Sequence, residues 1–142
     1  MTQVDFYILQ EGVGGDRYRL ACRIADKARN AGHRVVIHTA SAEEARHMDL
    51  LLWTFQEQSF VPHGLLGDAI PEINPVLIGD AAEAHDEHDV LINLAMETPT
   101  FFSRFERLAE CVDNDDVARS ASRERYRFYR DRGYPLNLHE IT

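Results

Sequence analysis

The sequence has little of what several common protein classes need. Only two of its 142 residues are cysteines, and Cys22 and Cys111 stand far apart. This spacing excludes a disulfide framework and any paired-cysteine metal or redox motif, so we expect two buried thiols. No run approaches the roughly 20 apolar residues that cross a bilayer. The first residues also lack a basic stretch followed by a cleavage site, and we therefore expect a cytoplasmic protein.

Motifs for catalysis and nucleotide binding are also missing. Lys27 is the only lysine, so the chain has no phosphate loop of the GK[ST] type. The glycine-rich segment 11–16 lies where a Rossmann fold binds a dinucleotide, but Arg17 replaces the third glycine and no acidic residue ends the next predicted strand. His63 could act as a general base, but the sequence has no serine or cysteine nucleophile in a recognisable motif for it to activate. A nucleotide- or small-anion-binding enzyme remains the alternative hypothesis, and we expect no cofactor.

One short acidic segment has the composition of a metal site. His85 and His88 lie three residues apart among carboxylates, between two predicted strands. Such a group can hold a divalent metal. A solvated acidic loop explains the same residues, and we adopt that interpretation.

The rest of the chain alternates strand and helix signals. Apolar runs rich in valine, isoleucine and leucine predict strands at residues 4–9, 34–39, 75–80, 89–95 and 108–113. Helical spacing and capping signals, such as Ser41 with Glu44, predict helices at residues 17–31, 41–53, 98–108 and 115–132. Residues 54–75 are expected to form a long irregular connection. We predict one α/β domain over residues 1–142, with three α/β/α layers and a largely parallel sheet, Rossmann-like but without a nucleotide site.

Charge is unevenly distributed along this chain of net charge −9. Residues 1–118 hold nine basic and 21 acidic residues, whereas residues 119–142 hold six basic and three acidic ones. The acidic body argues against a surface that follows a nucleic-acid backbone, which needs a wide positive field. The basic end of the chain is therefore expected to bind a small anionic partner.

The predicted last helix gathers arginines on one side. At about 100° per residue, five side chains fall within about 100° of one another. We call them the arginine face: Arg119, Arg123, Tyr126, Arg127 and Arg130. On the opposite side, Val117, Ala121 and Phe128 are expected to pack onto the sheet.

Three interpretations of the arginine face are open. It can be a charged surface in solvent, or it can bind a short acidic peptide through bidentate contacts between guanidinium and carboxylate groups. The third interpretation is that it binds single-stranded nucleic acid, with a base stacked on the tyrosine.

A second candidate surface surrounds Trp53 and Phe60. Large apolar side chains are frequent in this irregular segment, and a tryptophan near phenylalanine is typical of a protein-binding hot spot. A loop folded back on its own domain is the alternative.

Three stretches together resemble a known family over nearly the full chain. "VDFYIL", "LLLW…SFVPHG" and "RERYRFYRDRGYPLN", in this order and at these separations, are similar to the chi subunits of bacterial DNA polymerase III. The resemblance implies a non-catalytic adaptor of the clamp-loader complex, with no bound nucleotide. It implies two protein partners and no direct contact with nucleic acid or membrane. These partners are the psi subunit and the acidic, phenylalanine-ended C-terminal tail of single-stranded DNA-binding protein.

The resemblance also assigns residues to each partner. The implied psi-facing surface consists of Trp53, Phe60, Val61, Pro62 and His63. The implied tail-binding pocket consists of Arg119, Arg123, Tyr126, Arg127 and Val112. In this pocket the arginines receive the tail's carboxylates, and its last phenylalanine enters an apolar space beside Tyr126 and Val112. Segment 11–16 matches nothing in the family, and Arg127 stands where some members have lysine.

Overall fold

The computed structural model describes residues 1–56, 60–80 and 86–142, and these ranges contain seven strands and three α-helices. The strands are β1 (Gln3–Leu9), β2 (Val35–His38), β3 (His63–Leu65), β4 (Val76–Gly79), β5 (Val90–Asn93), β6 (Arg107–Val112) and β7 (Leu136–Ile141). The helices are α1 (Arg17–Asn30), α2 (Ala42–Thr54) and α3 (Asp116–Asp131), and η2 (Phe102–Arg104) is a short 3-10 turn. No helix in these ranges is long and apolar enough to cross a membrane.

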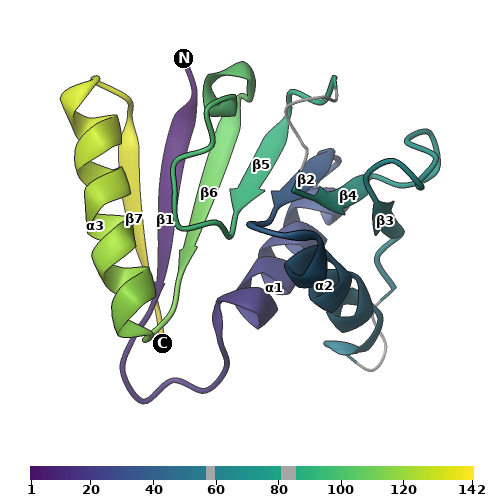
Figure 1. Cartoon of the computed structure of the whole chain (residues 1–142), viewed down its shortest axis with the longest axis horizontal. Coiled ribbons are helices and arrows are strands. Elements are labelled where there is room, and N and C mark those ends of the chain that lie inside the picture. Colours follow the sequence, from purple (N-terminus) through teal and green to yellow (C-terminus); the bar gives the residue numbers. More distant parts are fainter. Residues whose placement is uncertain (57–59, 81–85) are drawn as a thin grey trace.

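All seven strands lie parallel in one sheet, in the order β3-β4-β2-β5-β6-β1-β7 (Figure 1). The crossover from β1 through α1 to β2 and that from β6 through α3 to β7 run in opposite directions along this order. Because such crossovers are right-handed, α1 and α3 lie on opposite faces of the sheet. Helix α2 packs beside α1. The predicted fold class is confirmed.

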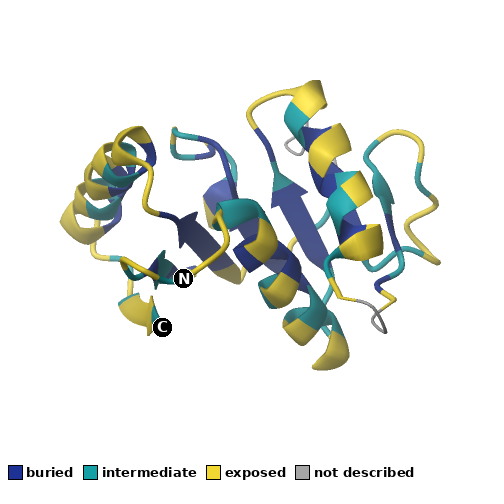
Figure 2. Ribbon diagram, turned by 90° about the horizontal axis from the view of Figure 1, so that it is seen from below, coloured by how far each residue is buried: buried dark blue, intermediate teal, exposed yellow. Residues whose placement is uncertain are grey.

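The middle of the sheet is apolar on both faces because both faces are covered. Every residue of β4 and β5 is buried, which is typical of parallel strands between two helical layers. On one face, Ile37 and Ile92 belong to a core that includes Met48 of α2. On the other face, Leu91 belongs to a core that includes Tyr129 of α3. Figure 2 shows the central strands as buried and the outer faces of the helices as exposed.

A side chain caps the start of each of the three α-helices. The Asp16 carboxylate accepts the Arg19 N–H at 3.0 Å, and the Asp115 carboxylate caps α3 in the same way. At α2, Ser41 Oγ accepts the Glu44 N–H at 3.1 Å, while Glu44 Oε1 accepts the N–H of Ala40 at 3.1 Å. Ser41 therefore caps the helix as predicted, while the return bond of Glu44 goes to the residue before the cap rather than to the N–H of Ser41.

The two cysteines lie in the core on the α1 face of the sheet, as expected. Cys22 is fully buried and Cys111 is 3% exposed. Burial raises the pKa of the Cys22 thiol to about 12. Both groups therefore behave as small apolar side chains rather than as nucleophiles.

The helix predicted at residues 98–108 is wrong. Only the turn η2 forms there, and no side chain caps it. Phe102 and Phe105 are both buried, three residues apart on one side of this tight turn, in the core on the α3 face. The chain then enters β6, where Leu108 pairs with both β1 and β5. Pairing and burial at this segment therefore override its helical pattern.

Two strands were not predicted. Residues 63–65 lie inside the expected irregular connection, yet they form β3 beside β4. Residues 136–141 form β7, which pairs with β1 from Leu136 to Ile141. Both are edge strands, and their mixed polar and apolar residues lack the continuous apolar run that identifies the central strands.

Candidate protein-binding surfaces

Helix α3 packs on the sheet through a face that the sequence pattern did not indicate. Its buried residues are Ala118, Ser122, Arg125 and Tyr129. The expectation that Val117 packs on the sheet is wrong, because this side chain is 69% exposed. Phe128 is half-buried, with its ring edge-on to Phe102 at 6.1 Å between centroids. This packing face lies between the arginine face on one side and Val117, Ala121 and Phe128 on the other. The sheet therefore covers each of these two sides only in part.

A buried polar network fixes α3 on the sheet. Glu110 of β6 is fully buried and accepts hydrogen bonds from Arg125 Nε at 3.0 Å, the Tyr129 hydroxyl at 2.6 Å and Asn93 Nδ2 at 3.0 Å. Arg125 also donates from Nη1 to the carbonyl of Met96 at 2.7 Å. Burial raises the pKa of Glu110, while the guanidinium of Arg125 and the hydrogen bonds to the carboxylate oppose the rise. Sequence analysis missed this network, since neither charge has a local signal of burial.

The arginine face lies on α3 as predicted, but its members differ in their contacts. Arg119 donates to the carbonyl of Leu9 at 2.8 Å and to Asn114 Oδ1 at 2.5 Å, so it is tied to the end of β1. Arg127 pairs with Glu124 and Arg130 with Asp131 in exposed ion pairs on the same helix. Such pairs contribute about 0–1 kcal/mol and exchange readily for another anion.

Arg123 is the most available of these guanidiniums. It is exposed, and within the described ranges it forms no hydrogen bond or ion pair. Tyr126 beside it is half-buried, with its ring edge-on to Phe6 at 5.5 Å between centroids. Val112 is 2% exposed, in the same apolar cluster as Tyr126. An aromatic side chain of a bound peptide can therefore contact Val112 only if neighbouring side chains move aside.

The second predicted surface lies around the end of α2 and the start of β3. Trp53 is 54% exposed and Phe60 is 58% exposed, with their ring centroids 5.5 Å apart. Leu50, one turn earlier on α2, is 67% exposed. Val61 is buried and Pro62 half-buried beneath this surface. The aromatic pair is thus not folded back into the core.

His63 supports this surface from below. It is 8% exposed and its ring lies 4.8 Å from that of Trp53. Its Nδ1 faces the carbonyl of Val61 at 2.6 Å, and its Nε2 faces the carbonyl of Asp49 at 3.0 Å. Both ring nitrogens are therefore engaged with the backbone, which does not suit a general base.

The two surfaces lie at opposite ends of the sheet. Trp53 and Phe60 adjoin β3, the first strand in the sheet order, whereas α3 lies beside β7, the last (Figure 1). The two candidate surfaces therefore do not overlap.

The N-terminus of α1 is closed to a phosphate group. Asp16 caps the Arg19 N–H, and Asp113 Oδ2 accepts both the backbone N–H of Arg17 at 3.0 Å and its Nη1 at 3.1 Å. Two N–H groups of the first turn are thus held by the chain's own carboxylates, which would also repel an anion. This geometry disfavours the hypothesis of a nucleotide-binding enzyme.

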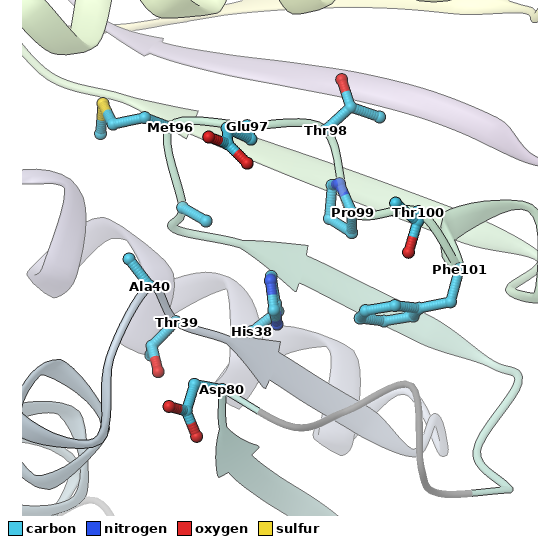
Figure 3. Close-up of a pocket in the computed structure, with 11 residues that line it drawn as sticks. His38, Thr39, Ala40, Asp80, Met96, Glu97, Thr98, Pro99, Thr100 and Phe101 are labelled. Atoms are coloured by element: carbon cyan, nitrogen blue, oxygen red, sulfur yellow. The ribbon is translucent and has the colours of Figure 1, made fainter.

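A cavity of about 420 Å³ lies at the carboxyl ends of β2, β4 and β5 (Figure 3). In doubly wound sheets this is where ligands commonly bind, because neighbouring connections leave in opposite directions. Among the described residues, its lining includes the carboxylates of Asp80 and Glu97 and contains no lysine or arginine. The cavity therefore does not suit a nucleotide phosphate either.

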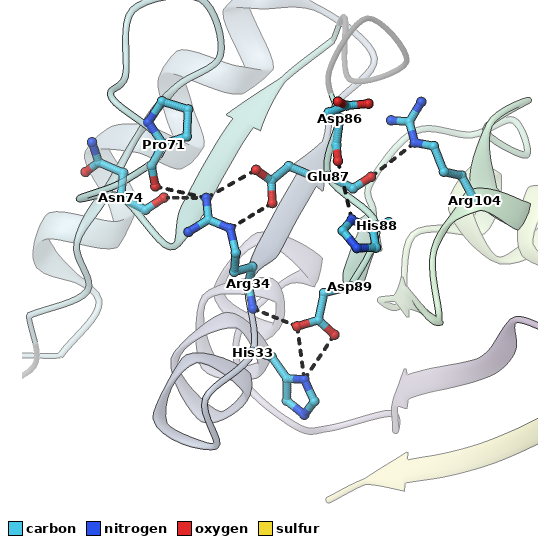
Figure 4. Close-up of polar contacts among 9 residues, drawn as sticks. All are labelled: His33, Arg34, Pro71, Asn74, Asp86, Glu87, His88, Asp89 and Arg104. Carbon is cyan, nitrogen blue, oxygen red and sulfur yellow. Dashed lines mark hydrogen bonds and ion pairs between the residues drawn. The ribbon is translucent and has the colours of Figure 1, made fainter.

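The metal hypothesis concerned His85 and His88, and His85 lies outside the described residues. His88 is exposed, and the carboxylates beside it have other partners (Figure 4). Glu87 binds the guanidinium of Arg34 at 2.9 and 3.2 Å, and Asp89 faces His33 Nδ1 at 3.1 Å. Within the part of the chain that the structure describes, no three histidine, cysteine or carboxylate side chains are placed to hold a metal.

Comparison with known proteins identifies the family. A family model described as "DNA polymerase III chi subunit, HolC" matches residues 1–137. The DNA polymerase III subunit chi of Pseudomonas aeruginosa is 38% identical over 141 residues, which cover 99% of this chain and 98% of the relative. The subunit of the same name from Haemophilus influenzae is 32% identical over 137 residues, and that of Escherichia coli is 31% identical over 142 residues. These matches cover 96% of this chain and 95% and 97% of the relatives.

The matches extend through both candidate surfaces, from the first strand to the last helix. They agree with the resemblance seen in the sequence, and two of the three stretches that carry it include residues of the aromatic surface and of the arginine face. The chain therefore belongs to the family of DNA polymerase III chi subunits, and its role is that of an accessory subunit in DNA replication.

Proposed function

We propose that this chain is a non-catalytic adaptor that links the DNA polymerase III clamp loader to single-stranded DNA-binding protein. In this proposal the arginine face of α3 binds the acidic C-terminal tail of that protein. The observation that carries the proposal is the exposed guanidinium of Arg123 beside Arg127 and the half-buried Tyr126. Several guanidiniums around an aromatic ring suit a peptide that ends in carboxylates and a phenylalanine. The adaptor acts in the cytoplasm.

The psi subunit, where the host has one, is the proposed partner of the second surface. Trp53 and Phe60 expose a contiguous aromatic pair, and a large aromatic anchor is typical of a binding hot spot. Because this surface and α3 lie at opposite ends of the sheet, one molecule can connect the two partners. Many weak tail contacts on coated DNA then act together through effective concentration.

The test of tail binding is a calorimetric titration with a synthetic tail peptide. Arg123→Ala and Arg127→Ala should each weaken binding by about 1.5–3 kcal/mol, or about tenfold to 150-fold, because each removes a charge-assisted contact. Binding should also fall with rising salt and require the peptide's terminal phenylalanine. Arg46→Ala, which changes an exposed arginine on α2, is the matched control. Equal affinity in the Arg123 variant, the Arg127 variant and the unchanged protein would refute the proposal.

The psi assignment has a separate test. Trp53→Ala should abolish capture of purified psi while leaving tail-peptide affinity unchanged, since the tryptophan lies far from α3. Retained psi binding in this variant would contradict the assignment. Direct binding of an oligonucleotide without any protein partner would favour the nucleic-acid interpretation of the arginine face instead.

A further inference from the structure

The outer strand β7 presents a backbone edge next to the arginine face. It is the last strand in the sheet order, and within the described ranges no strand pairs with its outer side. Figure 1 shows α3 alongside β7, and Tyr126 of α3 contacts Phe6 of the neighbouring strand β1. A peptide held by the arginine face therefore lies within reach of this edge.

The hydrogen bonds to β1 identify which β7 residues face outward. The Val4 N–H donates to the carbonyl of Pro135 at 3.0 Å, and the Gln10 N–H donates to the carbonyl of Ile141 at 3.0 Å. In a parallel pair, alternate residues of one strand turn both backbone groups toward the neighbour. Pro135, Asn137, His139 and Ile141 thus face β1. The N–H and C=O groups of Leu136, Leu138 and Glu140 then point to the open edge.

The side chain of Leu138 adds an apolar contact at the same place. Leu138 lies in register with Phe6, so its side chain is on the face of the sheet that α3 covers. Yet it is 57% exposed, because α3 covers only part of this outer strand. Half-buried Ile8 and Leu136 belong to the apolar cluster on the same face. Together Ile8, Leu136 and Leu138 form an apolar strip beside Tyr126.

The edge also lacks the usual protection against pairing. Natural edge strands commonly carry lysine, proline or a bulge, and none interrupts Leu136–Ile141. Glu140 is the only acidic residue of the strand, while residues 119–142 hold six arginines against three carboxylates. The local charge therefore favours an acidic peptide over a second copy of this chain, whose net charge is −9.

We propose that the acidic tail peptide binds in extended form along the open edge of β7, with its main chain paired to Leu138 and an apolar side chain on the strip beside Tyr126. Addition of a strand to a sheet edge is a common mode of peptide recognition, in which main-chain bonds give affinity. The arginine face then binds the carboxylates of the added strand. This inference rests on the proposed function and adds main-chain pairing to it.

Amide hydrogen exchange, measured by NMR with and without the synthetic tail peptide, tests the pairing. The amides of Leu138 and Glu140 face the open edge and should exchange at least tenfold more slowly in the complex. Those of Asn137 and His139 are already bonded to β1 and serve as internal controls. Slowing that occurs in the free protein and grows with its concentration would mean self-association at β7 and would overturn the proposal.

Two variants at one position separate the backbone from the side chain. Leu138→Pro removes the side chain together with an outward N–H that the sheet does not use, and should weaken peptide binding about fivefold more than Leu138→Ala. Leu138→Ala keeps the N–H and should weaken it about three- to tenfold by loss of apolar contact. Val117→Ala, which changes another exposed apolar residue, on the side of α3 away from the arginine face, should change nothing.

The outcomes for β7 and for the proposed function are distinguishable. If Arg123→Ala weakens the peptide but both Leu138 variants bind normally, and the Leu138 amide exchanges as in the free protein, pairing with β7 is wrong and the proposed function stands. If the peptide does not bind the unchanged protein at all, both are wrong.

Discussion

Replacing Glu110 with leucine should destabilise the protein more than any surface change, because it leaves a charge buried without its partner. Glu110 is fully buried and Arg125 is 4% exposed, with 3.0 Å between the guanidinium Nε and Glu110 Oε1. Removing one member of such a pair costs about 3–5 kcal/mol. A domain of this size has a total stability of about 5–15 kcal/mol, so the loss is a large fraction of it. Urea denaturation followed by circular dichroism measures the difference.

A double variant separates the lost charge partner from lost packing. In Glu110→Leu with Arg125→Met no buried charge remains, and most of the stability should return. About 1–2 kcal/mol should stay lost, because the Tyr129 hydroxyl and the Asn93 amide still lack their acceptor. Glu110→Gln should cost less than Glu110→Leu, because the amide oxygen of glutamine still accepts a hydrogen bond within this network.

The control is the same substitution on the surface of α3. Glu124 is exposed and pairs with Arg127, so Glu124→Leu should change the free energy of unfolding by less than about 1 kcal/mol. The reasoning fails if Glu110→Leu costs under about 1 kcal/mol, or if the double variant is as unstable as the sum of its two single variants.

Two further predictions concern the core and the start of α2. The buried Cys22, whose pKa is raised to about 12, should resist thiol reagents. Stability should fall as pH rises above about 9, because the unfolded chain releases the thiol proton while the native state retains it; a flat unfolding free energy from pH 8 to pH 10.5 would contradict this. Ser41→Ala should lower stability by about 1 kcal/mol through loss of the cap on the Glu44 N–H, measured by urea denaturation, whereas Ser120→Ala on the exposed side of α3 should not.

The sequence alone determined the elements with strong local signals. The valine-, isoleucine- and leucine-rich runs at β2, β4 and β5 have to be buried, and Ser41 and Asp115 mark the starts of α2 and α3. The arginine face also follows from spacing along one helix. For Trp53 and Phe60 the sequence left two alternatives, and only the structure shows that both side chains are exposed. The strands, the helix starts and the arginine face depend on neighbours within a few residues, which the sequence displays directly.

Only the tertiary structure decided the features that depend on distant partners. Arg125 differs from the other arginines of α3 because Glu110, fifteen residues earlier, lies buried beneath it. Residues 98–108 lose their helix because Leu108 pairs with strands on both sides. Residues 136–141 become β7 because β1 offers an open edge, and the free side of β7 exists only through that pairing. Strand pairing and ion-pair burial join residues far apart in the chain, so local spacing carries no record of them.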